Sequence, residues 1–113
     1  MKPSIRQIEK WCAALRSGKY KQGAGTLQKG DRFCCLGVAC DIFSPRHERD
    51  RYGVLSGLSP AFYHHDPAWL CGVNDNIYGV TGRLLSVYND ELKLTFDEIA
   101  DILELIYIHK ALD

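Results

Sequence analysis

The segment FCCLGVACDIF, residues 33–43, decides how the rest of the chain can be arranged. From Cys35 onward its apolar side chains recur at positions 35, 38, 39 and 42, which is the spacing of one helical face. Pro45 follows closely and would end such a helix just after Phe43. We therefore expect a short apolar helix at the centre of the fold.

Two longer helices are predicted to flank this central helix. The first covers residues 4–17, where Ser4 and Gln7 form a capping box and Gly18 takes the place of a left-handed helix end. Its apolar face consists of Ile5, Ile8, Cys12 and Leu15, with Trp11 beside them. The second covers residues 96–111, preceded by Thr95 and Glu98 as a second capping box. Its buried stripe consists of Phe96, Ile99, Ile102, Leu103 and Ile106.

The remaining segments favour short strands and turns. Residues 20–34 are predicted as a loop followed by a hairpin that turns at residues 29–31. Residues 52–55 and 69–73 are predicted as short strands, and residues 82–89 as a short helix. The chain as a whole predicts an α+β fold. We expect one globular domain over residues 1–113, with two long helices around a short central helix and a small antiparallel sheet.

Composition and charge exclude several classes of protein. The chain has 113 residues, of which 46% are hydrophobic and 25% charged, so neither disorder nor a collagen-like structure is expected. A formal net charge of zero argues against a nucleic-acid partner. However, residues 1–56 carry 11 basic and 5 acidic side chains, and residues 57–113 carry 3 basic and 9 acidic ones. This asymmetry fits two solvated faces, a basic patch for an anionic ligand, or an acidic face for a basic partner.

The compartment is predicted from what the sequence lacks. The first residues have no apolar core of a signal peptide, and no apolar run approaches the about 20 residues of a spanning helix. Five cysteines, two of them adjacent, fit reduced thiols better than a disulfide framework. We expect a cytoplasmic protein without a membrane partner. The cysteine spacing is not that of a zinc knuckle, so no metal is expected. The sequence also has no GxxxxGK(S/T) or GxGxxG pattern, and no cofactor is expected.

The adjacent thiols Cys34 and Cys35 allow two interpretations. A thiol in the first turn of a helix has a lowered pKa, and papain-like and NlpC/P60-like hydrolases place their nucleophile in this way. With His65 (or its neighbour His64) as the base, and Asp66 or Asn89 to orient it, one of the two thiols would make a cysteine-dependent hydrolase or transferase. The alternative is that both thiols are buried apolar side chains.

A second candidate site surrounds the stretch Gly23-Ala24-Gly25. Glycines let the backbone approach a ligand closely, an aromatic ring can stack on a base, and Arg can bind a phosphate. The residues that would supply these contacts are Trp11, Tyr20, Gln22 and Arg32, with Asn89 and Asp90 reaching a ribose or an amide. The alternative is a loop whose aromatic side chains cover the core, and a turn at residues 89–90.

Three segments resemble a group of small bacteriophage and prophage proteins. They are Trp11-x3-Leu15-x-Ser17-Gly18-x-Tyr20-x-Gln22, then Phe33-Cys34-Cys35-Leu36-Gly37-Val38-x-Cys40-Asp41, then Asn89-Asp90 with Phe96-x2-Ile99-Ala100-Asp101. The resemblance implies an accessory protein in the cytoplasm of a bacterial host. We expect it to counter host defence by binding a nucleotide-like host molecule or a host protein, as a homo-oligomer whose subunits share a pocket. The cysteine-dependent hydrolase or transferase is the alternative.

Overall fold

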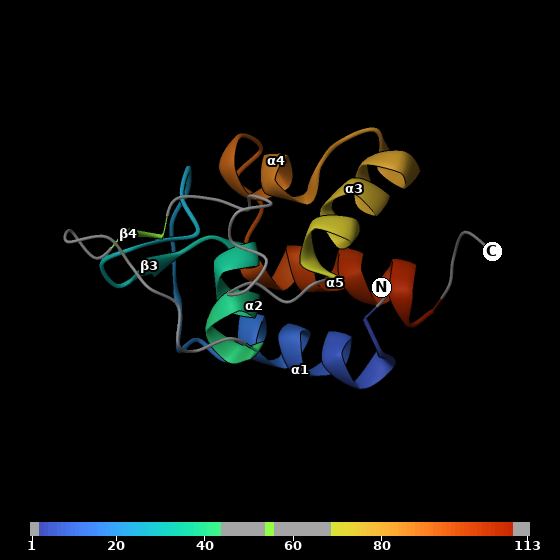
Figure 1. Ribbon diagram of the computed structural model, residues 1–113, viewed down its shortest axis with the longest axis horizontal. Helices are drawn as coiled ribbons and strands as arrows, with labels where there is room; N and C mark the ends of the chain where they lie inside the picture. The colour runs from blue at the N-terminus through green and yellow to red at the C-terminus, as the bar shows by residue number, and fades with distance from the viewer. Residues whose placement is uncertain (1–2, 44–53, 56–68, 110–113) are drawn as a thin grey trace.

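The computed structural model describes residues 3–43, 54–55 and 69–109, and its fold is α+β. The helices are α1 (Ile5–Arg16), α2 (Cys35–Phe43), α3 (Leu70–Thr81), α4 (Leu85–Asp90) and α5 (Phe96–Tyr107). The strands are β1 (Lys21–Gln22), β2 (Gln28–Lys29), β3 (Arg32–Phe33) and β4 (Val54–Leu55). Figure 1 shows the sheet at one end, α1 along the bottom with α5 above it, and α3 and α4 toward the top.

The two helices predicted as long, α1 and α5, pack directly against each other. Helix α3, which was not predicted as a long helix, has the same length of 12 residues. Helices α1 and α5 both begin with the predicted capping boxes, Ser4 with Gln7 and Thr95 with Glu98. Each helix buries one apolar stripe, as its periodicity predicts. The buried residues are Ile8, Trp11, Cys12 and Leu15 of α1, and Phe96, Ile99, Ala100 and Leu103 of α5. The prediction of Ile5 in the buried face is wrong, because this side chain lies in the first turn and is 51% exposed.

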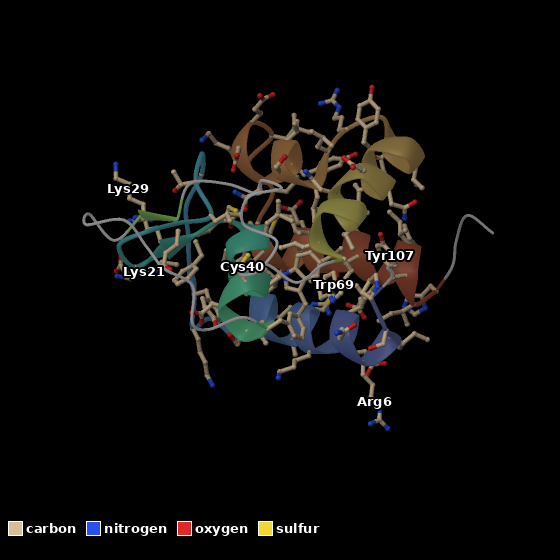
Figure 2. The ribbon with its side chains drawn as sticks, in the orientation of Figure 1. Arg6, Lys21, Lys29, Cys40, Trp69 and Tyr107 are labelled. Atoms are coloured by element: carbon tan, nitrogen blue, oxygen red, sulfur yellow. The ribbon has the colours of Figure 1, made fainter. Side chains whose placement is uncertain are left out.

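The central helix α2 is buried over its first six residues, Cys35 to Cys40. Helix α1 packs against it, and Trp11 donates its indole N–H to the carbonyl oxygen of Cys35 at 3.0 Å. At Gly37 the helix touches the loop before β2 so closely that an added Cβ would overlap the carbonyl oxygen of Leu27. Glycine is therefore required at this position by packing. Figure 2 shows Cys40 and Trp69 directed into this central region.

The sheet has the strand order β1-β3-β2-β4 in the described part of the chain. The predicted hairpin is confirmed: β2 and β3 pair antiparallel around Gly30, whose φ is +61°. The sheet is nevertheless mixed, because β1 pairs with β3 in parallel, Lys21 opposite Arg32. Since β2 already occupies one edge of β3, β1 joins the other edge and runs in the same direction as β3.

The segment predicted as a strand at residues 69–73 is the start of helix α3, so that prediction is wrong. Trp69 and Leu70, then Val73 and Ile77, are buried at helical spacing. A short apolar run does not distinguish a strand from a helix by its periodicity. The tertiary contact decides here: the Trp69 ring packs against Phe43 with ring centroids 5.4 Å apart.

The other predicted elements need smaller adjustments. The short helix predicted at residues 82–89 is α4, and it begins three residues later, at Leu85. The last helix ends at Tyr107, four residues before its predicted end at residue 111, because the described residues 108–109 are no longer helical. Of the predicted strand at 52–55, only Val54–Leu55 is described, and it is β4. Within the described residues, no helix combines the length and the apolar character needed to cross a membrane.

Candidate functional site

The amide of Asn89 connects three segments that are far apart in the sequence. It lies on α4, is 2% exposed, and is the only buried polar side chain in the described part of the chain. Its Nδ2 donates to the carbonyl oxygen of Gly23 at 2.8 Å and to Oδ1 of Asp90 at 2.7 Å. Its Oδ1 accepts from Nε2 of Gln22 at 2.9 Å and from the backbone N–H of Cys35 at 3.2 Å. Both donors and both acceptor positions of this amide are therefore used within the protein.

Gln22 completes this connection from the sheet. Its Nε2 also donates to the carbonyl oxygen of Leu94 at 2.7 Å, in the segment between α4 and α5. Both N–H bonds of this side chain are thus directed at α4 and the segment after it. Its Oε1 accepts no hydrogen bond from the described residues. The two amides together fix the β1 edge of the sheet against the α4–α5 turn.

An open pocket of about 390 Å³ lies beside these two amides. Its lining residues are Gln22, Gly23, Ala24, Arg32, Asn89 and Lys93. We call it the Arg32–Lys93 pocket. One wall comes from the β1 and β3 region of the sheet, and the other comes from α4 and the turn that follows it. Its volume is in the range of small-molecule binding sites.

The charge of the pocket is positive. Arg32 is exposed, and its Nη1 donates one hydrogen bond to the backbone carbonyl of Gln22 at 3.2 Å. The neighbouring carboxylate of Asp31 forms its ion pair with Lys21, at 2.9 Å. Lys93 has no ion pair or hydrogen bond with the residues that the structure describes. No carboxylate lines the pocket, so two cations face it without a contacting counter-ion.

Lys93 has an unusual backbone conformation. Its φ is +56°, in the left-handed region, and it is the only described residue other than glycine with a positive φ. It ends the α4 turn, where the N–H of Leu94 donates to the carbonyl oxygen of Tyr88 at 3.0 Å. Glycine is the usual residue at such a helix end. A lysine at this position costs about 1–2 kcal/mol of backbone energy.

Gly23 makes room for Arg32. A Cβ at Gly23 would lie 2.9 Å from the Cβ of Arg32, closer than side chains tolerate. The N–H of Gly23 also extends the pairing between β1 and β3 by donating to the carbonyl oxygen of Phe33 at 2.7 Å. The glycine therefore permits a close approach of two protein segments at the pocket wall, whereas the sequence suggested an approach to a ligand.

Of the six residues predicted to bind a ligand, three line this pocket: Gln22, Arg32 and Asn89. Asp90 accepts a hydrogen bond from Asn89 and is not among the lining residues. Lys93 was missed by the sequence reasoning. One feature of the sequence could have pointed to it: Lys93 is one of only 3 basic residues in the acidic half of the chain, residues 57–113.

The two predicted aromatic residues lie elsewhere. Trp11 has no exposed surface, and its N–H is already bonded to Cys35. Tyr20 donates its hydroxyl to Asp41 at 2.6 Å, and its ring packs edge-on against Phe33 at 5.0 Å. Burial, together with the hydrogen bond to Asp41, raises the pKa of Tyr20 to about 12. Neither ring is among the pocket-lining residues, so the structure offers neither for stacking on a ligand there.

The adjacent thiols are in the interior. Cys34 is 4% exposed and Cys35 has no exposed surface. Burial raises the pKa of Cys34 to about 11, although the N–H of Gly37, 3.4 Å from its sulfur, acts in the opposite direction. Burial also raises the pKa of Cys35 well above its usual value. The loss of solvation therefore outweighs the helix N-terminus, and both thiols stay protonated at neutral pH.

The other residues of the predicted cysteine chemistry give no second site. His65, the predicted base, and its neighbour His64 lie outside the described residues. Cys12 and Cys40 are buried, and the Cys12 thiol lies 3.6 Å from the carbonyl oxygen of Ala100. Within residues 3–43, 54–55 and 69–109, no group of three or more His, Cys, Asp or Glu side chains is placed to hold a metal ion.

Comparison with known proteins identifies a family. Residues 1–64 match the model of a domain of unknown function, DUF8296. The match covers more than half of the chain, so the protein belongs to this family. It includes the β1 and β3 wall of the pocket and ends before α4. No curated protein and no solved structure matches the chain.

Proposed function

We propose that this member of the DUF8296 family is a binding module that holds a small, anionic, nucleotide-like molecule in the Arg32–Lys93 pocket. The observation that carries the proposal is the pair of cations, which face an open pocket of about 390 Å³ without a contacting carboxylate. An anionic ligand would supply the missing counter-charge.

The chemistry of the two side chains supports an anion. Arg32 uses one N–H on the protein, and the planar guanidinium has further N–H groups for a bidentate contact with an oxyanion. Lys93 adds a compact charge with three donors. The amides of Gln22 and Asn89 hold the two walls together, so the site is formed before the ligand arrives.

Burial of the thiols argues against the alternative, a cysteine-dependent hydrolase or transferase. A nucleophile must be exposed and largely ionised, whereas Cys34 is 4% exposed with a pKa of about 11. A role as an accessory protein in a bacterial host stays a prediction, which rests on the resemblance to phage proteins. In that setting the ligand is made by a bacterial host, and its capture counters host defence.

A thermal-shift assay with mono-, di- and cyclic nucleotides tests the proposal. A ligand at 100 times its dissociation constant stabilises the native state by about 2.7 kcal/mol, which raises the melting temperature by about 11 °C at an unfolding entropy of about 2.1 cal/mol/K per residue. Arg32→Gln should abolish the shift. Lys29→Ala is the matched control, because this exposed lysine lies on β2 outside the pocket and points away from the body of the protein (Figure 2). An equal shift in the Arg32 variant, or no shift with any anion, would contradict the proposal.

A further inference from the structure

We infer that the Arg32–Lys93 pocket recognises the phosphoryl group of its ligand and does not read a nucleobase. The inference rests on the proposed function and narrows it to phosphate monoesters, bound through their charge. It follows from which polar groups of the pocket are free, which rings are absent from its walls, and where its two cations come from.

The neutral polar groups of the pocket are almost fully used. Asn89 makes two hydrogen bonds through Nδ2 and two through Oδ1, all within the protein. Gln22 has committed both N–H bonds of Nε2, to Asn89 and to Leu94. Only its Oε1, an acceptor, remains. Reading the edge of a base needs paired donors and acceptors, and these amides do not provide them.

The walls also lack a ring on which a base could stack. The lining consists of two amides, two small residues and two cations. Base stacking on aromatic side chains is the usual source of affinity for a nucleobase. Tyr20 is held by Asp41 and Phe33, and Trp11 is entirely buried, so neither is free to move to the pocket.

The free hydrogen-bond donors among the side chains that line the pocket are therefore cationic. Arg32 reaches the pocket from β3, and Lys93 reaches it from the turn after α4. A phosphate monoester carries a charge of about −1.5 to −2 at neutral pH, which two cations neutralise. Its oxygens can accept from the guanidinium fork and from the ammonium at once.

Two carboxylates lie near this arrangement. Asp31 is ion-paired with Lys21 and also interacts electrostatically with Arg32, and Asp90 lies beside Asn89. Asp90 is hydrogen-bonded to Asn89, and its carboxylate is close enough to Cys34 and Cys35 to raise the pKa of both thiols. The Asp90 carboxylate thus bonds a lining amide, although Asp90 itself is not among the lining residues. The lining itself carries only positive charge.

Calorimetric titration of the full chain with defined probes tests the inference. The probes are AMP, CMP, ribose 5-phosphate, adenosine and citrate. We expect AMP, CMP and ribose 5-phosphate to bind within about threefold of one another, and adenosine to bind at least about tenfold more weakly, the cost of losing charge-assisted hydrogen bonds.

Each other outcome has a separate meaning. Binding of AMP about tenfold more tightly than CMP and ribose 5-phosphate would overturn the inference and leave the proposed function standing. Binding of citrate in preference to every phosphate ester would overturn both the inference and the nucleotide-like ligand of the proposed function, and would leave only an anion-binding pocket. If none of these probes binds, the proposed function fails together with the inference.

Variants connect the affinity to the two cations. Arg32→Lys keeps the charge and removes the fork, so the affinity for ribose 5-phosphate should fall, and Arg32→Gln should lower it by about tenfold or more. Lys93→Ala should have a similar effect, and the Lys29→Ala control should stay within about twofold of the wild type. Circular dichroism checks that each variant is folded. Full affinity in the folded Arg32→Gln and Lys93→Ala variants would refute the assignment.

Discussion

Replacing Lys93 with glycine should stabilise the protein while it weakens ligand binding. The backbone of Lys93 has a φ of +56°, which costs a residue with a Cβ about 1–2 kcal/mol. Glycine adopts this conformation freely, but it loses about 0.5–1 kcal/mol more conformational entropy on folding. The net gain in the free energy of unfolding is therefore about 0.5–1 kcal/mol.

The expected change in melting temperature follows from the size of the chain. An unfolding entropy of about 2.1 cal/mol/K per residue makes 0.5–1 kcal/mol equivalent to a rise of about 2–4 °C for a chain of 113 residues. Thermal unfolding followed by circular dichroism measures this rise. The titration with ribose 5-phosphate, carried out on the same sample, measures the loss of affinity.

Two control variants separate the backbone from the charge. Lys93→Ala removes the ammonium and keeps the left-handed strain, so it should lose affinity without gaining stability. Gly82→Ala tests the opposite change: Gly82 has a φ of +83° and open space around it, so added strain alone should destabilise the protein by about 1 kcal/mol. The reasoning is refuted if Lys93→Gly melts no higher than Lys93→Ala, or if it binds the phosphate ester as well as the wild type does.

Further predictions concern the buried framework. Asn89→Ala leaves the hydrogen-bond partners of this buried amide unsatisfied, so the free energy of unfolding measured in urea should fall by about 2–4 kcal/mol. The control Asn76→Ala removes an exposed amide and should lower it by less than about 1 kcal/mol. Gly37→Ala should prevent folding, because the added Cβ would overlap the carbonyl oxygen of Leu27. Gly79→Ala, at a helical position with open space, should stabilise the protein by about 0.5–1 kcal/mol. A folded Gly37→Ala variant would contradict the close contact between α2 and Leu27. A native Cys34 thiol keeps its proton to about pH 11, while an unfolded one loses it near 9.0. The contribution of this thiol to stability should therefore be constant below about pH 9 and decline above it. Rapid alkylation of Cys34 at pH 6, located by mass spectrometry, would refute its burial.

Local patterns in the sequence predict much of the secondary structure. The two capping boxes and the left-handed Gly18 involve residues within three or four positions of one another, and each is present in the structure. The turn of the β2–β3 hairpin is equally local, with its positive φ at Gly30. Such signals are readable because the interacting groups are neighbours in the chain.

Where several packings satisfy the same pattern, the sequence is ambiguous. Residues 69–73 fit a buried strand or a buried helix equally well, and contact with Phe43 and Trp11 places Trp69 at the start of a helix. The parallel pairing of β1 with β3 is likewise invisible in the pattern, because it depends on which edge of the hairpin is still open. Long-range contacts decide both features.

By itself the sequence determined the α+β fold class, the capped starts of α1 and α5, and the polar residues of the Gly23 region. Only the tertiary structure decided which of those residues share a pocket. Gln22 and Asn89 are 67 positions apart and meet through a hydrogen bond that no local pattern encodes. Packing likewise decided that Trp11, Cys34 and Cys35 are interior, since burial depends on what covers a helix and not on its own periodicity alone.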